Sequence, residues 1–450
     1  MSDREQQGGP QGWRRTTLGE ALPIHYGKAR NDRYGTVRVN TPVYGSSGRI
    51  DTFNRALTSG PSLIIGRKGN VGSAYYSPEP CWPIDTVYFA EASEEEDLRF
   101  FKYLLDHLQL VRKDRSTAVP GLSRDDYNAT EVLVPELDQQ RLIVAEIEKQ
   151  FSRLDEAVAN LKRVKANLKR YKASVLKAAV EGKLTEDWRK QHPGVESASN
   201  LLERILAERR VKWNGRGKYK EPAKPDTSNL PLLPKHWTYA PVDSFLIEPM
   251  CNGISVKGSM TPPGVPALRL NAMTETGFDY SKVRYIPIDA ALAKELEVKA
   301  GDFFVSRGNG SLRLVGRGTV AQTPPRQCVF PDTMIRLRVA VAMGTSRWIS
   351  TIWSAELIRR QIEKRVKTTA GIWKISQPEL GSILLPVPPE AEQHRIVDEV
   401  ERRLSVIDEL EATVEANLTR AERLRQSILS SAFAGELVRE SARIQSIPTT

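Results

Sequence analysis

The chain has 450 residues, with 66 lysines and arginines against 55 aspartates and glutamates, and a formal net charge of +11 at pH 7. This length exceeds what one hydrophobic core supports, so we expect about two to four domains. No apolar run approaches the roughly 18 to 20 residues of a membrane span, and the polar residues 1–12 lack the apolar segment of a signal peptide, so a soluble protein is expected.

The three cysteines, Cys81, Cys251 and Cys328, lie far apart in the sequence and form no Cys-x-x-Cys pair. Few histidines are present that could complete a zinc site with them. This cysteine usage predicts no structural metal and a location in the reducing cytoplasm.

Residues 13–134 carry short β-branched and aromatic runs, the clearest at 37–39, 63–65 and 87–89, separated by glycine and proline turns. Such runs predict the short strands of an irregular sheet. One helical stretch is expected at 94–111. The region is therefore predicted to be an α+β domain whose loops are available for contacts.

A long helix is predicted between Pro135 and Gly182, because apolar residues recur there every seven positions. The series is Ile147, Leu154, Leu161, Leu168 and Val175, interleaved with Phe151, Val158, Val164 and Tyr171. This repeat is typical of a coiled-coil seam. The alternative is a helix packed on its own domain, but about 40 residues reach roughly 60 Å, so we expect it to pair with another long helix.

A short helix at 201–213, capped by Ser197 or Ser199, and a basic, proline-rich linker at 214–234 are expected next. A second α+β region follows at 237–387, with strand-like runs at 303–305 and 334–339 and a helical stretch at 346–367. The second long helix follows Pro388-Pro389 and ends before Gly435. Its seven-residue series is Val400, Ile407, Val414, Ala421 and Ile428, joined by Leu404, Leu410, Leu418 and Leu424.

The two halves of the chain are related by duplication. Residues 123–184 return without a gap as residues 376–437, so adding 253 to a residue number finds its equivalent. Pro10-x-x-Trp13 likewise matches Pro234-x-x-Trp237, and a Cys-x-x-x-Asp-Thr frame occurs at 81–86 and at 328–333. Between these anchors the halves diverge. We expect an α+β protein with an internal pseudo-two-fold axis, in which two antiparallel long helices form a coiled coil. Its two similar domains are expected to recognise different ligands.

We find no catalytic constellation. The sequence lacks a Gly-x-x-x-x-Gly-Lys-Ser/Thr loop, a Gly-x-Gly-x-x-Gly turn between strand and helix, and an Asn/Asp-Pro-Pro-aromatic tetrapeptide of amino-methyltransferases. Asp85 and Asp332 could belong to a nuclease, but their recurrence beside Thr86 and Thr333 favours a structural turn or strand end. We therefore predict a protein with no catalytic residues.

The basic residues fall mostly in loops and linkers, at 28–38, 67–68, 112–115, 209–224 and 307–317. This distribution suits a polyanion, and nucleic acid better than membrane. Arginine and lysine suit guanine, asparagine suits adenine, and serine or tyrosine suits phosphate. The candidate DNA-binding residues of the first domain are Lys28, Arg30, Tyr44, Ser46, Ser47, Arg49, Arg67, Lys68 and Asn70, and those of the second are Lys257, Arg269, Asn271, Arg307, Asn309, Arg313 and Arg317.

With these motifs the chain resembles the specificity subunit of a type I restriction–modification system. The resemblance covers nearly all of it: a tryptophan motif at Trp13 and Trp237, variable recognition regions, Gln-centred motifs at 139–144 and 392–397, and closing motifs at 179–184 and 432–437. The stretch 66–72 with the following 81–86 resembles a common form of the first recognition domain. Residues 301–310 take the corresponding place in the second, which departs from the first by a longer insert at 311–318.

The resemblance implies that each recognition domain reads one half of a bipartite DNA target and that the paired helices fix the unread spacer between the halves. It also implies docking of two modification subunits that carry the adenine methyltransferase, and of restriction subunits. The chain itself would be non-catalytic and bind no cofactor, with S-adenosylmethionine, ATP and Mg²⁺ bound by the partner subunits.

The expected boundaries are a first recognition domain at 1–135, a first spacer helix at 136–184, a short helix and linker at 185–234, a second recognition domain at 235–388, a second spacer helix at 389–437 and a tail at 438–450. Two other classes of protein share some of these features. A fused catalytic restriction–modification subunit would need motifs that are missing here. A coiled-coil scaffold with two protein-binding heads fits the repeats, but not the clustering of arginine, lysine and asparagine on divergent glycine loops.

Overall fold

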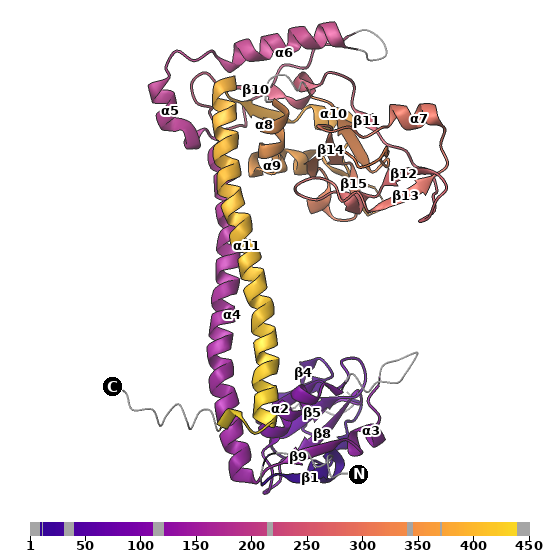
Figure 1. Cartoon of the computed structure of the whole chain (residues 1–450), viewed down its shortest axis with the longest axis vertical. Coiled ribbons are helices and arrows are strands. Elements are labelled where there is room, and N and C mark those ends of the chain that lie inside the picture. Colours follow the sequence, from indigo (N-terminus) through magenta and orange to yellow (C-terminus); the bar gives the residue numbers. More distant parts are fainter. Residues whose placement is uncertain are drawn as a thin grey trace, which may run out of the picture. The chain divides into compact units, whose positions relative to one another are not determined.

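The computed structural model describes residues 10, 12–30, 40–110, 121–213, 219–339, 345–369 and 371–438. The chain divides into two compact units, the first formed by residues 1–164 and 413–450 and the second by residues 165–412 (Figure 1). No helix in these described ranges is long and apolar enough to cross a membrane. The strand predicted at 37–39, the basic cluster at 112–115 and part of the predicted linker, 214–218, lie outside the described residues.

The first unit is built from short strands around one core. Its larger sheet has the order β2-β8-β5-β6 (His25–Tyr26, Val87–Glu91, Ser62–Gly66 and Ala74–Ser77). A second sheet has the order β4-β3-β7 (Gly48–Phe53, Thr41–Gly45 and Trp82–Pro83). Helix α2 (Leu98–Leu108) packs on the larger sheet, because Phe101 and Leu105 share a buried core with Leu63 and Ile65. The predicted helix at 94–111 is thus shorter at both ends.

The second unit contains more short sheets. The largest has the order β11-β17-β14-β16 (Cys251–Asn252, Met334–Leu337, Phe303–Ser306 and Gly318–Val320). The hairpin β12–β13 (Val265–Leu268 and Val283–Ile286) is separate, and a third sheet has the order β15-β19-β18 (Gly308–Asn309, Ile372–Lys374 and Lys367–Thr369). Helices α5 (Glu186–Gln191), α6 (Ala198–Lys212) and α7 (Ala290–Glu295) complete its outer parts.

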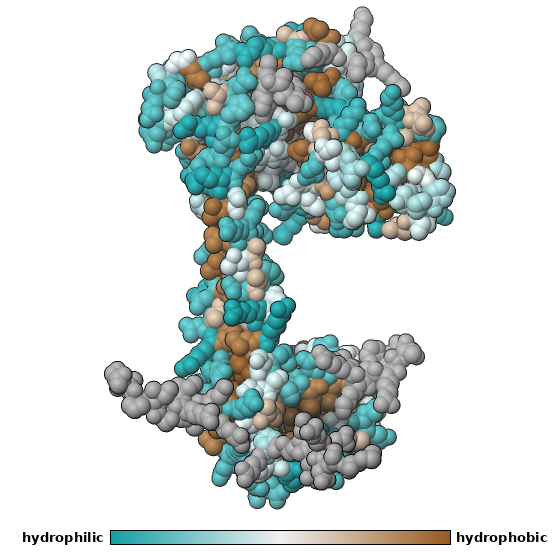
Figure 2. Space-filling model, in the orientation of Figure 1, coloured by the Kyte–Doolittle hydropathy of each residue, from teal (hydrophilic) through white to brown (hydrophobic). Residues whose placement is uncertain are grey.

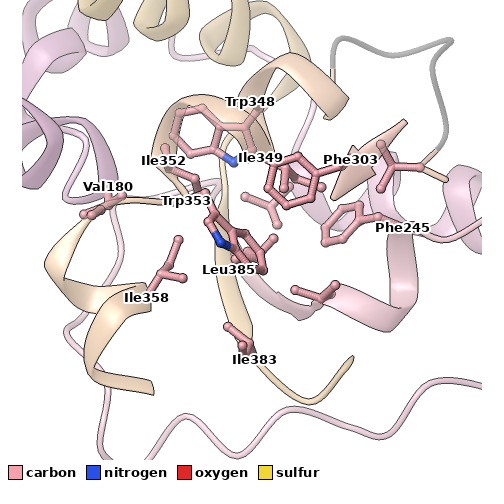
Figure 3. Packing of buried hydrophobic residues seen from close by; sticks show 14 of the residues in the cluster. Val180, Phe245, Phe303, Trp348, Ile349, Ile352, Trp353, Ile358, Ile383 and Leu385 are labelled. Atoms are coloured by element: carbon pink, nitrogen blue, oxygen red, sulfur yellow. The ribbon is translucent and has the colours of Figure 1, made fainter. Parts of the chain in front are cut away.

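The core of the second unit gathers around two buried tryptophans (Figure 3). The Trp348 indole N–H donates to the Pro386 carbonyl at 2.9 Å, and the Trp353 indole N–H donates to the Gly316 carbonyl at 2.8 Å. The helical stretch predicted at 346–367 is wrong as one element. It splits into α8 (Thr345–Ile352) and α9 (Glu356–Arg365) at Trp353, whose ring leaves the helix line to pack against Phe303.

Each half opens and closes its α+β region with the same antiparallel ladder. In the first unit β1 (Arg14–Thr17) pairs with β9 (Glu131–Val134), with Arg14 opposite Val134. In the second, β10 (Thr238–Pro241) pairs with β20 (Leu384–Val387), with Thr238 opposite Val387. Val134 and Val387 are equivalent under the offset of 253, so the duplication preserves strand register as well as sequence.

The long helices α4 (Leu137–Val180) and α11 (Glu390–Phe433) each have 44 residues and run antiparallel. In the first unit, Ile143 and Ile147 near the start of α4 share a core with Ile428 near the end of α11. In the second unit, the end of α4 at Val180 shares a core with Ile396 near the start of α11. The fold expected from the heptads is therefore confirmed.

Two ion pairs cross the seam at equivalent places. Asp155 pairs with Arg425 in the first unit, and Asp408 pairs with Lys172 at 3.6 Å in the second. Adding 253 converts Asp155 to Asp408 and Lys172 to Arg425, so one pair is the duplicate of the other. The Arg425 guanidinium also lies 4.1 Å from the Phe151 ring.

Part of the predicted seam is wrong. Four of its predicted members are 44 to 48% exposed: Leu410, Leu424, Val164 and Tyr171. Leu424 and Tyr171 each lie one position before a residue of the ion pairs across the seam, Arg425 and Lys172, so they flank the seam. Figure 2 accordingly shows hydrophobic side chains on the surface of the paired helices.

A buried carboxylate closes the second half. Glu392, fully buried at the start of α11, pairs with Arg189 of α5 at 2.5 Å, accepts a hydrogen bond from the Trp237 indole at 2.8 Å and another from Thr185 at 2.6 Å. Its equivalent in the first half is Gln139, and there the Trp13 indole N–H is buried without a partner among the described residues. The matched tryptophan motifs therefore have different surroundings.

Two glycines at equivalent places leave no room for a side chain. A Cβ on Gly27 would lie 2.0 Å from the Ile84 carbonyl oxygen, and one on Gly253 would lie 2.2 Å from the Phe330 carbonyl oxygen. Because these obstacles are backbone, we expect Gly27→Ala or Gly253→Ala to cost about 1 to 3 kcal/mol in the free energy of unfolding. Denaturant unfolding measures the change.

The matched controls are Gly60→Ala in the first unit and Gly310→Ala in the second, since a Cβ at either position meets nothing within 4 Å. Equal effects at the crowded and open positions would contradict this explanation.

Candidate nucleic-acid interface

Arg67 and Arg307 are held by the same four-part geometry, which we call the arginine clamp. Each follows a central strand, β5 or β14. The Arg67 backbone N–H donates to Thr86 at 3.0 Å and its Nη1 donates to the Asp85 carbonyl at 3.2 Å. The Arg67 carbonyl accepts from the Leu122 N–H at 2.9 Å.

The second clamp repeats these contacts. The Arg307 N–H donates to Thr333 at 2.8 Å, its Nη1 donates to the Asp332 carbonyl at 3.3 Å, and its carbonyl accepts from the Ile375 N–H at 2.9 Å. The structure thus matches Arg307 to Arg67. It also explains the repeated Asp-Thr frame, which supplies backbone carbonyls to the clamp and so is a structural turn, as the sequence predicted.

Several candidate residues of the first unit gather beside the clamp. The hairpin tip between β3 and β4 contacts the loop after β5, because the Ser46 carbonyl accepts from Ser73 at 2.9 Å and from Tyr75 at 3.4 Å. Exposed on these two loops are Ser47, Arg49, Lys68 and Asn70, while Tyr44 and Arg67 are half-buried. The loops therefore form one polar and basic surface.

Lys28 and Arg30 lie beside the same hairpin. Lys28 is exposed, and its carbonyl accepts from the Trp82 indole at 2.9 Å. Arg30 pairs with Asp51 of β4 at 2.5 Å, and this hydrogen bond lowers the pKa of the Asp51 carboxyl. Arg30 therefore already has an anionic partner, which a phosphate would have to displace.

The candidates of the second unit fall into two groups. Arg307, Asn309, Arg313 and Arg317 belong to one loop, whose ends are joined because Ser306 and Arg317 form a backbone hydrogen bond of 2.8 Å. The other group lies on or beside the β12–β13 hairpin, where Arg269, Asn271 and Lys257 are all exposed.

Two lysines at the first group were missed in the sequence. Lys374 of β19 lies opposite Gly308, and a Cβ on Gly308 would lie 3.2 Å from the Lys374 side chain. Lys367 of β18 lies opposite Lys374 and pairs with Glu379 at 2.7 Å. A signal was available, because Lys367-Thr368-Thr369-Ala370 resembles Arg115-Ser116-Thr117-Ala118.

Not every predicted basic residue is available to a polyanion. Arg209, counted in the basic segment 209–224, is buried on α6 at 2% exposure. Its guanidinium donates to the Leu246 carbonyl at 3.0 Å, pairs with Asp243 at 3.2 Å and lies 4.3 Å from the Trp213 ring. Its part in the predicted DNA footprint is therefore wrong, since this arginine fixes the inter-half segment to the second unit.

Comparison with known proteins places this architecture. Residues 10–170 match the family described as type I restriction modification DNA specificity domain. The chain is 27% identical over 391 residues to the type I restriction enzyme EcoKI specificity subunit of Escherichia coli strain K12, covering 85% of this chain and 74% of that protein. It is 25% identical over 441 residues to the EcoDI specificity subunit of Escherichia coli, covering 95% and 89%.

A solved structure from work on complex assembly and conformational transition of the type I R-M system has the same fold, with a TM-score of 0.65 at 16% identity over 95% of this chain and 99% of that one. Both curated relatives are specificity subunits of type I restriction enzymes. Residues 10–170 therefore match a type I restriction modification DNA specificity domain, and the whole chain is similar in sequence and fold to type I restriction enzyme specificity subunits.

Proposed function

We propose that this chain recognises a bipartite DNA target, with one half-site read by each unit. The observation that carries the proposal is the pair of arginine clamps, which share their backbone contacts while the side chains around them differ. Two domains that bind different DNA sequences need the same backbone geometry but different side chains. Phosphate contacts fix the position of a protein on DNA, whereas side chains at the base edges determine which sequence is bound.

We further propose that the segments shared by the two halves dock two modification subunits that carry the adenine methyltransferase, and that restriction subunits join this complex. The Gln-centred motifs support this proposal by their equivalence: Gln140 and Gln393 are both buried and donate to the Pro135 and Pro388 carbonyls at 2.9 Å, so the two halves offer a partner the same local structure. S-adenosylmethionine, ATP and Mg²⁺ would be bound by the partner subunits. The direct test is to map methylated adenines in DNA modified by the assembled complex, which should reveal one motif with two specified halves.

Non-specific DNA affinity should fall steeply with salt. The exposed lysines and arginines beside both clamps would displace counterions from DNA, with a slope of log K on log salt of about −0.9 for each phosphate contacted. Fluorescence titration with random duplex at two salt concentrations measures this slope. Affinity that does not change with salt, or no binding at all, would instead favour a scaffold with protein-binding heads.

Removing one clamp should affect one half-site only. Arg67→Ala is expected to reduce discrimination in the half-site read by the first unit, and Arg307→Ala in the other, by roughly 1 to 3 kcal/mol if a bidentate base contact is lost. Competition between duplexes that differ in one half-site measures the effect. Arg15→Ala is the control, because this arginine is 78% exposed and pairs with Glu131 away from the clamp. Equal losses in both halves would make the clamp arginines general phosphate contacts.

A further inference from the structure

A pair of side chains stands beside each arginine clamp at equivalent positions, and it differs between the halves. In the first unit the pair is Tyr26 and Arg124, and in the second it is Asn252 and Gln377. The strand members correspond because Tyr26 lies opposite Tyr88 in the β2–β8 ladder, while Asn252 lies opposite Ile335 in the β11–β17 ladder.

The helix members correspond as well. Arg124 and Gln377 are the first residues of the short helices α3 (Arg124–Asn128) and α10 (Gln377–Gly381), each preceded by a capping serine. Adding 253 to 124 gives 377. In both halves a single serine separates the helix from the residue whose N–H completes the clamp, which is Leu122 in the first unit and Ile375 in the second.

Each pair makes its own internal contact. The Arg124 guanidinium lies 5.8 Å from the Tyr26 ring, and the Arg67 guanidinium lies 5.1 Å from the same ring. In the second unit, the Gln377 amide instead donates to the Asn252 side-chain carbonyl at 3.0 Å. The same two places on one scaffold therefore carry a cation on an aromatic ring in one half and two linked amides in the other.

We propose that these pairs determine which base each unit selects: Arg124, supported by Tyr26, reads a guanine in one half-site, and Gln377 with Asn252 reads an adenine in the other. The inference rests on the proposed DNA-binding function and assigns the residues that distinguish its two half-sites. Arginine donates to guanine O6 and N7, whereas glutamine or asparagine donates to adenine N7 and accepts from its amino group.

The side chains retain the groups that this reading needs. Arg124 is exposed and gives one donor, Nη2, to the Ile24 carbonyl at 3.0 Å, which leaves other N–H groups of its guanidinium. Within the described part of the chain, Gln377 uses one N–H on Asn252, so its carbonyl and second N–H remain for a base. The clamp arginines, in contrast, are partly engaged by backbone carbonyls in the same way in both halves.

The test uses the full chain assembled with its modification subunits, and maps methylated adenines for each variant. Arg124→Ala should relax a single guanine position in one half-site, and Gln377→Ala a single adenine position in the other, each lowering discrimination about 10- to 100-fold. Arg124→Lys keeps the charge but loses the fork of donors, so it should lower discrimination at the same guanine position by less than Arg124→Ala does. Arg15→Ala, which removes an exposed arginine that pairs with Glu131 away from both pairs, should leave the motif unchanged.

The outcomes are distinguishable. If Arg124→Ala weakens all matching sites equally, the residue contacts phosphate and the inference fails while the proposed function stands. Relaxation in both half-sites by either variant would also overturn it. A wild-type complex that yields no bipartite motif would refute the proposed function itself. Thermal unfolding of each variant shows that the fold is retained.

Discussion

Glu392→Ala is expected to destabilise the second unit by about 3 kcal/mol. The carboxylate is fully buried and is shared by Arg189, Thr185 and the Trp237 indole. Without this carboxylate, the largely buried Arg189 guanidinium and the Trp237 indole N–H have lost an acceptor. Buried donors that have neither water nor a protein acceptor lower the free energy of unfolding. Hydrogen exchange of peptides from α5 and β10 measures the local free energy of opening, which suits a chain whose two units need not unfold together.

Position 139 offers a matched control. Gln139→Ala alters the equivalent residue of the first half, which carries no charge to pair, so a loss below about 1 kcal/mol is expected. Glu392→Gln keeps the size and two hydrogen-bonding atoms but removes the charge, and should fall between the two alanine variants. Similar effects for Glu392→Ala and Gln139→Ala would mean that the buried ion pair contributes nothing beyond packing.

Lengthening the paired helices should change the spacer of the DNA target. Insertion of four residues after Ala166 adds about one turn and roughly 6 Å to α4, equal to about one or two base pairs at roughly 3.4 Å each. Methylation mapping should then show a longer spacer between unchanged half-site sequences, because the recognition loops lie outside the helices.

A second variant lengthens both helices and keeps their apolar residues facing each other. In the first unit the ion pair Asp155–Arg425 fixes the register of the two helices, so Leu161 and Thr419, each six residues from its member of the pair, lie level with each other. Inserting one heptad into each helix at these positions adds roughly 10 Å, or about three base pairs, without shifting the apolar stripe. Replacing the exposed Arg163, Asn167 and Arg170 by alanine changes no length and serves as the control. Retained activity with an unaltered spacer in the heptad variant would show that the helices do not set the distance.

The sequence predicted the features that depend on local pattern. Heptads predicted the helix pair, and the duplication predicted its antiparallel direction. Serine caps and terminal glycines marked helix ends, since Gly182 and Gly435 have φ of +69° and +75°. The sequence could not separate Leu410 and Leu424 from the seam. Leu410 and Leu424 are 14 residues apart, as are Leu404 and Leu418, so the two pairs have the same spacing. A small rotation of the helix decides which pair is more buried.

The site was harder to predict for the same reason. The clamps use backbone carbonyls of Asp85 and Asp332, which leave no trace in residue type, and the Asn252–Gln377 pair joins residues 125 positions apart. Arg209 belonged by charge to the basic surface, but its burial depends on contacts with Asp243 and Leu246 that only the fold brings near. The composition of the sequence thus predicted which loops are basic, but not which of their residues are exposed and available for binding.

The crossed ion pairs of the coiled coil have an evolutionary meaning. Each long helix carries one acidic and one basic member, Asp155 with Lys172 and Asp408 with Arg425, so each copy is complementary to itself. Two identical half-length ancestors could have joined through this interface as a symmetric dimer, and such a dimer reads a palindrome. Fusion of two gene copies into one chain ended that constraint. Under the proposed function, each half could then mutate its recognition loops separately, so that one chain reads two different half-sites.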